Sequence, residues 1–406
     1  MPAIETAHAN YKSKRPLSAA ADVEARQVMP GGNTRSVLHF DPFPFRVVAA
    51  NGPHLTDIDG HTYVDLLGNY TAGLLGHSPA PIQRAVSAAL ETGFAMGATH
   101  TVEIEAATLM ANRFPSIEQV RFTNSGTEAN LMAIGVAMHH TGRRRVIVFE
   151  NGYHGGVLSF AQRGSALNVP HDFAVLPFND VEAVRAAFVD SEIACVLVEP
   201  MQGSGGCRIA DDGFLEQLRK LCDESGALLI FDEVMTSRLS PGGAQQLLGV
   251  TPDMTTLGKY LAGGLTFGAF GGRADILQAF DPQSGGELSQ AGTFNNNILS
   301  MSAVVATLTE VLTDDLILTV NERGDRLRES LNSIFASARA DMRATGIGSL
   351  MVIHARDEVM ELFFHAMIDE GWYLARRGFI ALSVDITDEL IDGFLAAVRS
   401  WVTNSD

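Results

Sequence analysis

The chain has 406 residues, of which 46% are hydrophobic and 19% are charged, and its formal net charge at pH 7 is −18. This composition is typical of a soluble globular enzyme and excludes an intrinsically disordered chain. The negative charge argues against nucleic acid or an anionic membrane as a partner, because both are bound by basic surfaces. No stretch of about 18 uninterrupted apolar residues is present to span a bilayer.

The three cysteines are sparse and form no Cys-x-x-Cys pair, which favours reduced thiols in a cytoplasmic compartment. The N-terminal residues contain no apolar run between a basic start and a small-residue cleavage site, so no secretory signal is predicted. We therefore expect a cytoplasmic protein.

Residues 1–50 read as a polar tail followed by a turn-rich loop that contains Pro30-Gly31-Gly32. The next segment, residues 55–66, is typical of a β-hairpin with Asp59-Gly60 as its turn. Apolar residues then recur at helical spacing in two segments, 79–92 and 101–114.

Short apolar strands alternate with helices over the middle of the chain. The predicted strands are 119–123, 145–149, 173–177, 194–198 and 227–231, and the predicted helices are 128–140 and 212–224. This alternation predicts an α/β fold with a mostly parallel sheet that helices cover on both faces. Ligands in such sheets bind at the carboxyl ends of the strands.

The C-terminal part of the chain has a different pattern. It has helical spacing over 297–341, 357–370 and 388–403, and strands at 348–354 and 378–383. We predict a large domain over residues 51–300 and a smaller α+β domain over residues 301–406. Residues 1–50 are expected to join the smaller domain.

Lys259 is one of only four lysines, and its neighbours in sequence are apolar residues and glycines. No acidic residue is closer in sequence than Asp253. An ammonium group there would lose hydration without a local partner, which lowers its pKa and yields a neutral amine that can act as nucleophile or base. The alternative is a lysine that extends to solvent from the end of an element.

Ser125-Gly126-Thr127 lies between a predicted strand and a predicted helix. Its hydroxyls and backbone N–H groups would form an anion site at the helix N-terminus. A simple helix cap is the alternative, because Ser125 precedes Glu128 by three residues.

Asp232 ends an apolar strand, and strand alternation places Val234 on its side and Glu233 on the other. A buried carboxylate requires a cation or hydrogen-bond donors, and a protonated pyridine nitrogen is one such cation. A metal ion would need further ligands at suitable spacing, and the sequence predicts no metal site.

Three further segments carry candidate binding residues. In the glycine-rich segment 150–156, Tyr153 or His154 is suited to stacking on an aromatic ring; His154 has no second histidine at metal-ligand spacing. The polar loop 291–297 contains Thr293, either a cap or a second donor to an anion. Arg35, on the turn-rich loop, is either a surface charge or a carboxylate clamp.

Taken together, these segments resemble the class III aminotransferases, which are pyridoxal 5′-phosphate (PLP) enzymes of fold type I. The matching segments occur in family order: Asn124-Ser125-Gly126-Thr127-Glu128-Ala129, Tyr153-His154-Gly155, Glu199-Pro200-Met201-Gln202-Gly203, Phe231-Asp232-Glu233-Val234, Leu257-Gly258-Lys259 and Gly292-Thr293-Phe294. The resemblance implies a seven-stranded, mostly parallel sheet and a homodimer with shared active sites.

The resemblance also implies a role for each matched residue. Lys259 would hold the cofactor covalently as an internal aldimine, and Asp232 would pair with its pyridinium nitrogen. Other matched residues would bind the phosphate (Ser125, Gly126, Thr127, and Thr293 from the other subunit), contact the two ring faces (Tyr153 and Val234) or lie near the ring hydroxyl (Gln202).

Two branches of the family compete. The loop at Pro30-Gly31-Gly32 is similar to that of glutamate-1-semialdehyde aminomutases, but its arginine is displaced. The longer run from Arg35 to Pro44 and the segments 267–272 and 292–297 look more like β-phenylalanine aminotransferases. That likeness implies that Arg35 binds the carboxylate of a β-amino acid, and that Arg377, with Arg376 as a rival, binds the acceptor's carboxylate.

The sequence thus predicts a homodimeric transaminase. It would move the amino group of a β-amino acid, aromatic as in β-phenylalanine, to 2-oxoglutarate or pyruvate by a ping-pong mechanism. The alternatives are a semialdehyde aminomutase, or a non-catalytic binding protein that keeps the scaffold. The presence of both Lys259 and Asp232 speaks against the non-catalytic protein.

Overall fold

The structure is a computed structural model that describes residues 2–161, 164–190 and 192–404. The chain forms two compact units, Met1–Pro79 with Val320–Asp406, and Ala80–Thr319. We call them the first and the second unit. Within the described residues, no helix is both long and apolar enough to cross a membrane.

The second unit is built on a seven-stranded sheet with the order β4-β12-β11-β10-β7-β5-β6, as predicted. The strands are β4 (Gln119–Thr123), β5 (Arg145–Phe149), β6 (Asp172–Leu176), β7 (Ile193–Val198), β10 (Leu228–Asp232), β11 (Met254–Gly258) and β12 (Gly268–Gly272). The neighbouring strands pair in parallel except at β12, which is antiparallel to both β11 and β4.

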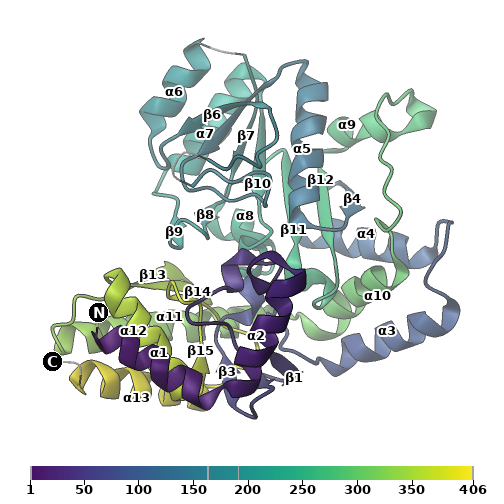
Figure 1. Ribbon diagram of the computed structural model, residues 1–406. Coiled ribbons are helices and arrows are strands. Elements are labelled where there is room, and N and C mark those ends of the chain that lie inside the picture. Colours follow the sequence, from purple (N-terminus) through teal and green to yellow (C-terminus); the bar gives the residue numbers. More distant parts are fainter. Residues whose placement is uncertain (1, 162–163, 191, 405–406) are drawn as a thin grey trace. The chain divides into compact units, whose positions relative to one another are not determined.

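Two hydrophobic clusters show that both faces of this sheet are covered. Alternate residues of β10 enter different clusters: Ile230 packs with Ala133 of α5 (Gly126–Thr141), whereas Leu229 and Phe231 pack with Leu218 of α7 (Phe214–Ser225). This is the period of two that a strand buried on both faces requires. Figure 1 shows α5 running along the sheet.

The helices of the second unit are α3 (Ala80–Thr92), α4 (Thr101–Arg113), α5 (Gly126–Thr141), α6 (Val181–Asp190), α7 (Phe214–Ser225), α8 (Gly243–Leu248), α9 (Ala274–Leu277) and α10 (Ile298–Ala306). Among them, α3, α4, α5, α7 and α10 lie in segments predicted to be helical, whereas α6, α8 and α9 were not predicted. A small hairpin joins β8 (Met201–Gln202) to β9 (Arg208–Ile209). The helix predicted over 297–341 is interrupted by a π-helical turn at Thr307–Val311.

The first unit contains two small sheets and joins both ends of the chain. One sheet has the order β1-β2-β3-β15 and the other β13-β14-β16. The strands are β1 (Val47–Asn51), β2 (His54–Asp57), β3 (Thr62–Asp65), β13 (Arg343–Ile347), β14 (Leu350–His354), β15 (Trp372–Tyr373) and β16 (Phe379–Ala381). The predicted hairpin is confirmed, because β2 and β3 pair antiparallel around Asp59-Gly60.

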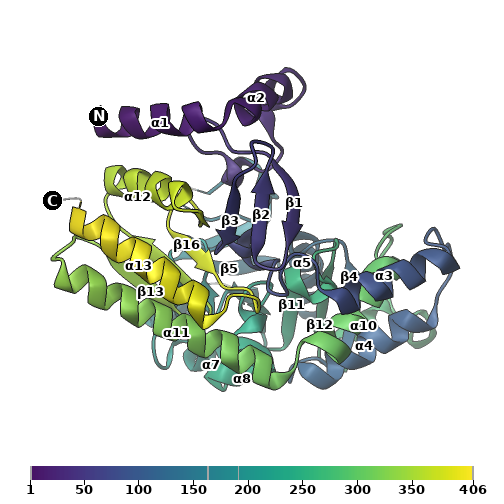
Figure 2. The same ribbon diagram turned by 90° about the horizontal axis from the view of Figure 1, so that it is seen from below.

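The helices of the first unit correct one prediction. They are α1 (Pro2–Lys14), α2 (Pro16–Val28), α11 (Asp314–Ser337), which begins in the second unit, α12 (Asp357–Asp369) and α13 (Asp388–Asn404). The predicted polar tail is wrong, because α1 buries Tyr11 in a cluster that also contains Phe40 and Phe364. Figure 2 shows α1 beside α12.

The division between the units also differs from the proposed domain limits near residues 50 and 300. It falls after Pro79 and after Thr319. The hairpin β2–β3 belongs to the first unit because β3 pairs with β15. In this pairing, Val64 and Asp65 lie opposite Trp372 and Tyr373.

Candidate active site

Lys259 and Asp232 lie at the carboxyl ends of two neighbouring parallel strands. Asp232 is the last residue of β10 and pairs with Thr256 of β11. Lys259 follows Gly258, the last residue of β11, and has a left-handed backbone with φ of 56°. Such a conformation is strained for a residue with a side chain, and strain of this kind is concentrated at functional sites.

Asp232 is buried, with 4% of its surface exposed, and its carboxylate is held by three groups. Oδ2 accepts a 2.8 Å hydrogen bond from Nδ2 of Asn130 and lies 2.8 Å from Nδ1 of His154. Oδ1 accepts a 3.0 Å hydrogen bond from the backbone N–H of Val234. Asn130 is held in turn by Thr256, whose hydroxyl donates to Oδ1 over 2.7 Å.

His154 therefore faces Asp232 and does not have the stacking role that was one of two sequence interpretations. Burial lowers the pKa of His154, but the hydrogen bond to Asp232 and the charges of Asp232 and Glu199 outweigh burial and raise it. Burial raises the pKa of Glu199 to about 7. The imidazole is thus favoured in its charged form beside the carboxylate.

Glu233 belongs to a separate structural network on the other side of β10, as alternation predicts. It is fully buried and accepts hydrogen bonds from the backbone of Ala244 over 2.5 Å and from the backbone and side chain of Gln245 over 3.0 Å each. Asp232 and Glu233 therefore do not converge on a common metal site.

The structure confirms that Ser125 caps a helix, and the anion site at this segment stays a prediction. Ser125 is the N-cap of α5, and its hydroxyl accepts a 3.2 Å hydrogen bond from the backbone of Glu128. The carboxylate of Glu128 accepts a 2.6 Å hydrogen bond from the backbone N–H of Asn124, the residue before the N-cap. The first N–H groups of α5 still point from a helix N-terminus, where anions are stabilised.

Close backbone approaches bring the predicted cofactor segments together. A Cβ atom on Gly126 would lie 2.6 Å from Cγ2 of Val234, and a Cβ atom on Gly258 would lie 3.3 Å from Cγ1 of the same valine. On Gly155 it would lie 2.1 Å from the hydroxyl of Thr127. Three segments thus meet at Val234: Ser125-Gly126-Thr127, the end of β10 and the segment before Lys259.

Tyr153 and Gln202 lie next to this group in different environments. Tyr153 is 48% exposed, and its backbone N–H donates to Oε1 of Glu199 over 2.9 Å. Gln202 is buried, and its amide donates to the backbone carbonyl of Glu150 over 2.7 Å. An exposed aromatic ring suits stacking, whereas the role of Gln202 near a ring hydroxyl stays a prediction.

The loop that carries Thr293 is anchored at both sides. Nδ2 of Asn124 donates to Oδ1 of Asn295 over 2.9 Å, and the carbonyl of Asn296 lies 2.7 Å from Nε2 of His100. Thr293 itself is exposed. Its role toward a second subunit stays a prediction.

In the first unit, Arg35 and Arg377 meet at one tyrosine ring. Their guanidinium carbons lie 5.9 Å and 5.6 Å from the ring centroid of Tyr70, within cation–π range. Nη1 of Arg35 also donates to Oδ1 of Asn69 over 2.5 Å. Arg376 points elsewhere, because its Nε lies 2.5 Å from Oε2 of Glu361.

Tyr70 stands on a strained turn. Asn69, Tyr70 and Thr71 have φ values of 46°, 51° and 80°, which side-chain-bearing residues rarely adopt. The ring of Tyr70 stacks on Phe379, with centroids 5.7 Å apart. Sequence reasoning missed Tyr70, Asn130 and Thr256, because their patterns are those of ordinary turn, helix and strand residues.

Comparison with known proteins agrees with this arrangement. The family model described as "Aminotransferase class-III" matches residues 38–400. The beta-phenylalanine transaminase of Variovorax paradoxus is 45% identical to this chain, over 98% of this chain and 96% of its own length.

Solved structures give the same result. The structure of a beta-phenylalanine aminotransferase from Variovorax paradoxus has a TM-score of 0.97 at 45% identity and covers 99% of this chain and 97% of its own. An omega-transaminase from Sphaerobacter thermophilus has a TM-score of 0.90 at 31% identity, covering 96% and 98%. A glutamate-1-semialdehyde-aminomutase from Pseudomonas aeruginosa, 23% identical with a TM-score of 0.89 and coverage of 98% and 97%, shows the fold alone.

The matched region includes Lys259, Asp232 and the whole seven-stranded sheet. The chain belongs to the class III aminotransferases, enzymes of fold type I that depend on pyridoxal 5′-phosphate.

Proposed function

We propose that the protein is a transaminase that moves the amino group of a β-amino acid with an aromatic side chain, such as β-phenylalanine, to 2-oxoglutarate or pyruvate in a ping-pong cycle. Its similarity to a relative named for β-phenylalanine supports this donor. The observation that carries the proposal is the presence of Arg35 and Arg377 at the same ring, Tyr70.

The residues of the second unit fit PLP. The carboxylate of Asp232 is buried and oriented by Asn130 and His154, which suits it to hold a protonated pyridine nitrogen. The N-terminus of α5 suits a phosphate group, with Ser125, Gly126 and Thr127 as its ligands. When bound, PLP supplies a carbonyl group for the amine and an electron sink for the substrate carbon.

Lys259 would hold the cofactor and then act as a base through its Nζ atom. As a free amine, Nζ would take up and return the proton at the substrate carbon. Val234 packs against Gly126 and Gly258, so its side chain fits the predicted contact with one ring face. Tyr153 would cover the other face, and Gln202 would lie near the ring hydroxyl.

Two arginines would recognise the two carboxylates of the cycle. Arg35 would bind the carboxylate of the β-amino acid, bidentately as a guanidinium allows, and Arg377 would bind that of the acceptor. The bond from Arg376 to Glu361 supports Arg377 over Arg376 for the second role. The ring of Tyr70, which lies near both guanidinium groups and stacks on Phe379, would offer an aromatic surface to the donor's side chain.

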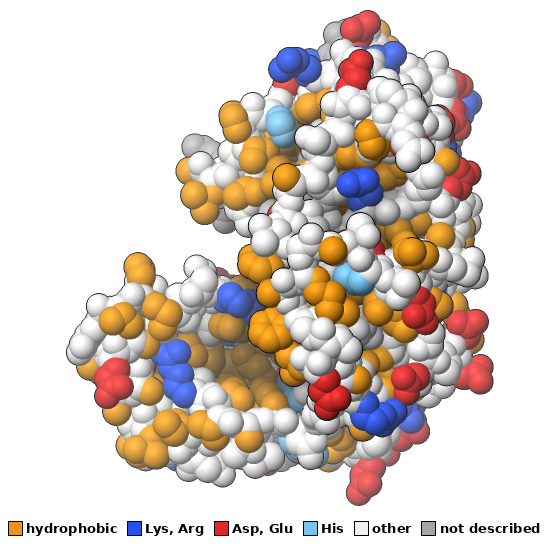
Figure 3. Space-filling view, turned by 90° about the vertical axis from the view of Figure 1, so that its right-hand side faces the viewer, with side chains coloured by type: hydrophobic (Ala, Val, Ile, Leu, Met, Phe, Trp, Pro, Cys, Tyr) orange, Lys and Arg blue, Asp and Glu red, His pale blue; other side chains and the backbone are white. Residues whose placement is uncertain are grey.

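A homodimer with shared sites is part of the proposal. Large hydrophobic residues are exposed on α4 and on the loop of Thr293, with Ile104 68% and Phe294 66% exposed. The side chain of Asn296 donates to Glu103 of α4 over 3.1 Å, so these segments form one surface. Figure 3 faces the side on which α3, α4 and α10 lie in Figure 1, and it shows groups of hydrophobic side chains there.

A cytoplasmic location completes the proposal. Cys195, Cys207 and Cys222 are all buried, in keeping with thiols that stay reduced.

Steady-state kinetics with Arg35→Ala test the substrate assignment. We expect KM for β-phenylalanine to rise about 10- to 100-fold, because a charged hydrogen-bonded pair is lost. KM for 1-phenylethylamine, which has the same ring and amine but no carboxylate, should change little. An equal change for both amines would remove Arg35 from the carboxylate site.

The same experiment separates the two neighbouring arginines. Arg377→Ala should raise KM for 2-oxoglutarate or pyruvate about 10-fold or more, whereas Arg376→Ala should leave it nearly unchanged. The opposite pattern would transfer the acceptor role to Arg376. If wild-type enzyme transfers no amino group from any β-amino acid while it accepts simple amines, the proposed donor class is wrong.

A further inference from the structure

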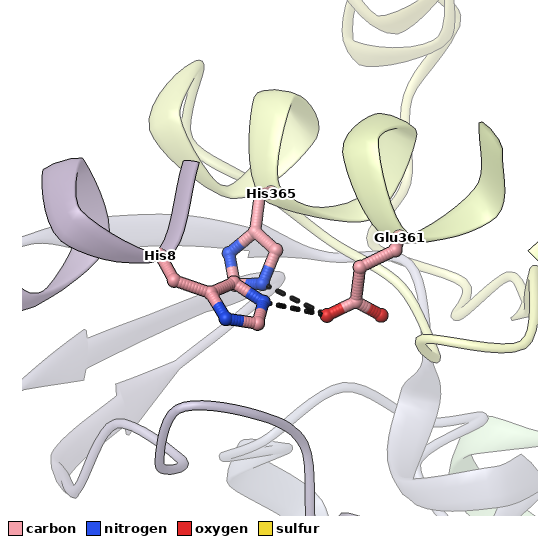
Figure 4. A group of neighbouring side chains, drawn as sticks. All are labelled: His8, Glu361 and His365. Carbon is pink, nitrogen blue, oxygen red and sulfur yellow. Dashed lines mark hydrogen bonds and ion pairs between the residues drawn. The ribbon is translucent and has the colours of Figure 1, made fainter. Parts of the chain in front are cut away.

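Three side chains with metal-binding atoms converge where α1 packs against α12. Glu361 and His365 are one turn apart on α12, and His8 reaches them from α1 (Figure 4). One ligand atom of each residue lies within 4.8 Å of the corresponding atoms of the other two. The sequence predicts no metal here, because His8 is separated from Glu361 by 353 positions.

Two of the three distances between the ligand atoms are close to those of a tetrahedral zinc site. Nε2 of His8 lies 2.9 Å from Oε1 of Glu361, and Nε2 of His365 lies 3.3 Å from the same oxygen. Figure 4 shows both imidazole rings directed at this one oxygen. Ligand atoms about 2.0–2.1 Å from a zinc ion are themselves separated by about 3.4 Å, so small side-chain movements would place an ion among these atoms.

His365 is the feature that points to a ligand. It is only 3% exposed; its Nε2 has the carboxylate of Glu361 as a partner at 3.3 Å, whereas its Nδ1 makes no hydrogen bond with the described part of the chain. A buried polar group without a partner is costly. Tyr11 and Phe364 pack edge-on against its ring, with centroids 5.4 Å away in both cases, and hold the ring toward Glu361.

The neighbours of Glu361 favour the anionic form of its carboxyl group, which is the form that binds a metal ion. Burial raises its pKa, but His365, Arg376 and His8 together lower it to about 2. Arg376 contacts Oε2 and leaves Oε1 facing the two histidines. Metal-binding carboxylates are commonly oriented in this way by a hydrogen bond to their second oxygen.

We propose that His8, Glu361 and His365 bind a divalent transition-metal ion through Nε2, Oε1 and Nε2, with water as a further ligand. Two imidazoles and one carboxylate suit Zn²⁺, and they also accept Co²⁺ or Ni²⁺. The ion would join α1 to α12 and so hold the N-terminal helix against the rest of the first unit. The positive charge of Arg376, which contacts Oε2 of Glu361, opposes the ion, so the affinity should be moderate.

Titration of the untagged, chelator-treated holoenzyme with ZnCl₂ tests this proposal. Calorimetry at pH 7.5 should show one Zn²⁺ per chain. His8→Gln and His365→Gln should each weaken binding at least 10-fold, because a ligand to the ion is lost. His140→Gln is the matched control: His140 is an exposed histidine on α5, and its loss should leave the affinity unchanged.

Hydrogen exchange gives a second measurement that does not depend on activity. Zn²⁺ should slow amide exchange in α1 of the wild-type protein but not of His8→Gln. The visible absorbance of the bound cofactor verifies that each variant is folded. The proposal is overturned if wild-type protein binds no Zn²⁺, or if both ligand variants bind it as tightly as His140→Gln and show the same exchange in α1.

Discussion

Gly126 shows how a single hydrogen atom in place of a methyl group shapes the candidate cofactor site. A Cβ atom there would lie 2.6 Å and 2.8 Å from the two γ-carbons of Val234. Such distances force a shift, and Val234 is stiff because it is branched at Cβ. The segment Ser125-Gly126-Thr127 can therefore approach the end of β10 only with glycine at its centre.

We predict that Gly126→Ala weakens PLP binding about 10-fold or more, because the first turn of α5 must move away from Val234. Dissociation constants from absorbance titration of the apoenzyme would measure this. Gly135→Ala is the control in the same helix: its Cβ atom would meet nothing within 4 Å, and it should add about 0.5–1 kcal/mol of stability.

The double variant Gly126→Ala/Val234→Ala sharpens the test, since it removes the γ-carbons that a new Cβ atom would strike. Part of the lost affinity should return. If Gly126→Ala binds PLP as well as wild type, the close packing at Val234 has no part in holding the cofactor.

At the scale of elements, much of the second unit follows from the sequence. The apolar runs of β5, β7 and β10 are buried along their whole length, and such strands are recognisable without any partner. Strand β12 was missed, because Gly268-Ala269-Phe270-Gly271-Gly272 lacks the residues that favour strands. Tertiary packing explains why glycine occurs there: a Cβ atom on Gly268 would lie 2.1 Å from the carbonyl oxygen of Ser125.

The candidate site was partly predictable for a similar reason. Lys259, Asp232 and Ser125 stand at strand ends or helix starts, where position alone suggests chemistry. Asn130 touches Asp232 across 102 positions, and the two arginines meet at Tyr70, which lies on a left-handed turn. Contacts of this kind depend on the folded chain and leave no local pattern.

The docking of α1 on α12 should depend on pH through Glu361. Its pKa falls from 4.5 to about 2 in the folded protein, so its interactions stabilise the fold above pH 4.5 and are lost as the pH falls toward 2. In chelator, we predict that Glu361→Gln lowers the free energy of unfolding at pH 7 by roughly 1–3 kcal/mol. The difference from wild type should shrink below pH 4.5.

Chemical denaturation at pH 7 and at pH 3 measures this effect. Glu358→Gln, an exposed change on the same helix, should show no pH-dependent difference. A loss of stability for Glu361→Gln that is the same at both pH values would mean that packing, not charge, explains it.

At the scale of the whole molecule, we expect two chains to assemble through the surface that carries Ile104. Ile104→Glu should shift the protein from dimer toward monomer in sedimentation velocity, because an interface cannot easily bury an unpaired charge. Val189, 84% exposed on α6, provides the control, and Val189→Glu should leave the mass unchanged. A dimer that persists with Ile104→Glu places the interface elsewhere.

The first unit has a consequence for how the protein is made. Strand β3 pairs with β15, near the other end of the chain, whereas the sheet that bears Lys259 is complete by residue 272. During synthesis the second unit can fold while the ribosome still holds the remaining residues, and domains generally fold as units. The edge of β3 in the hairpin β2–β3 therefore stays unpaired until the last quarter of the protein, which contains β15, has been synthesised.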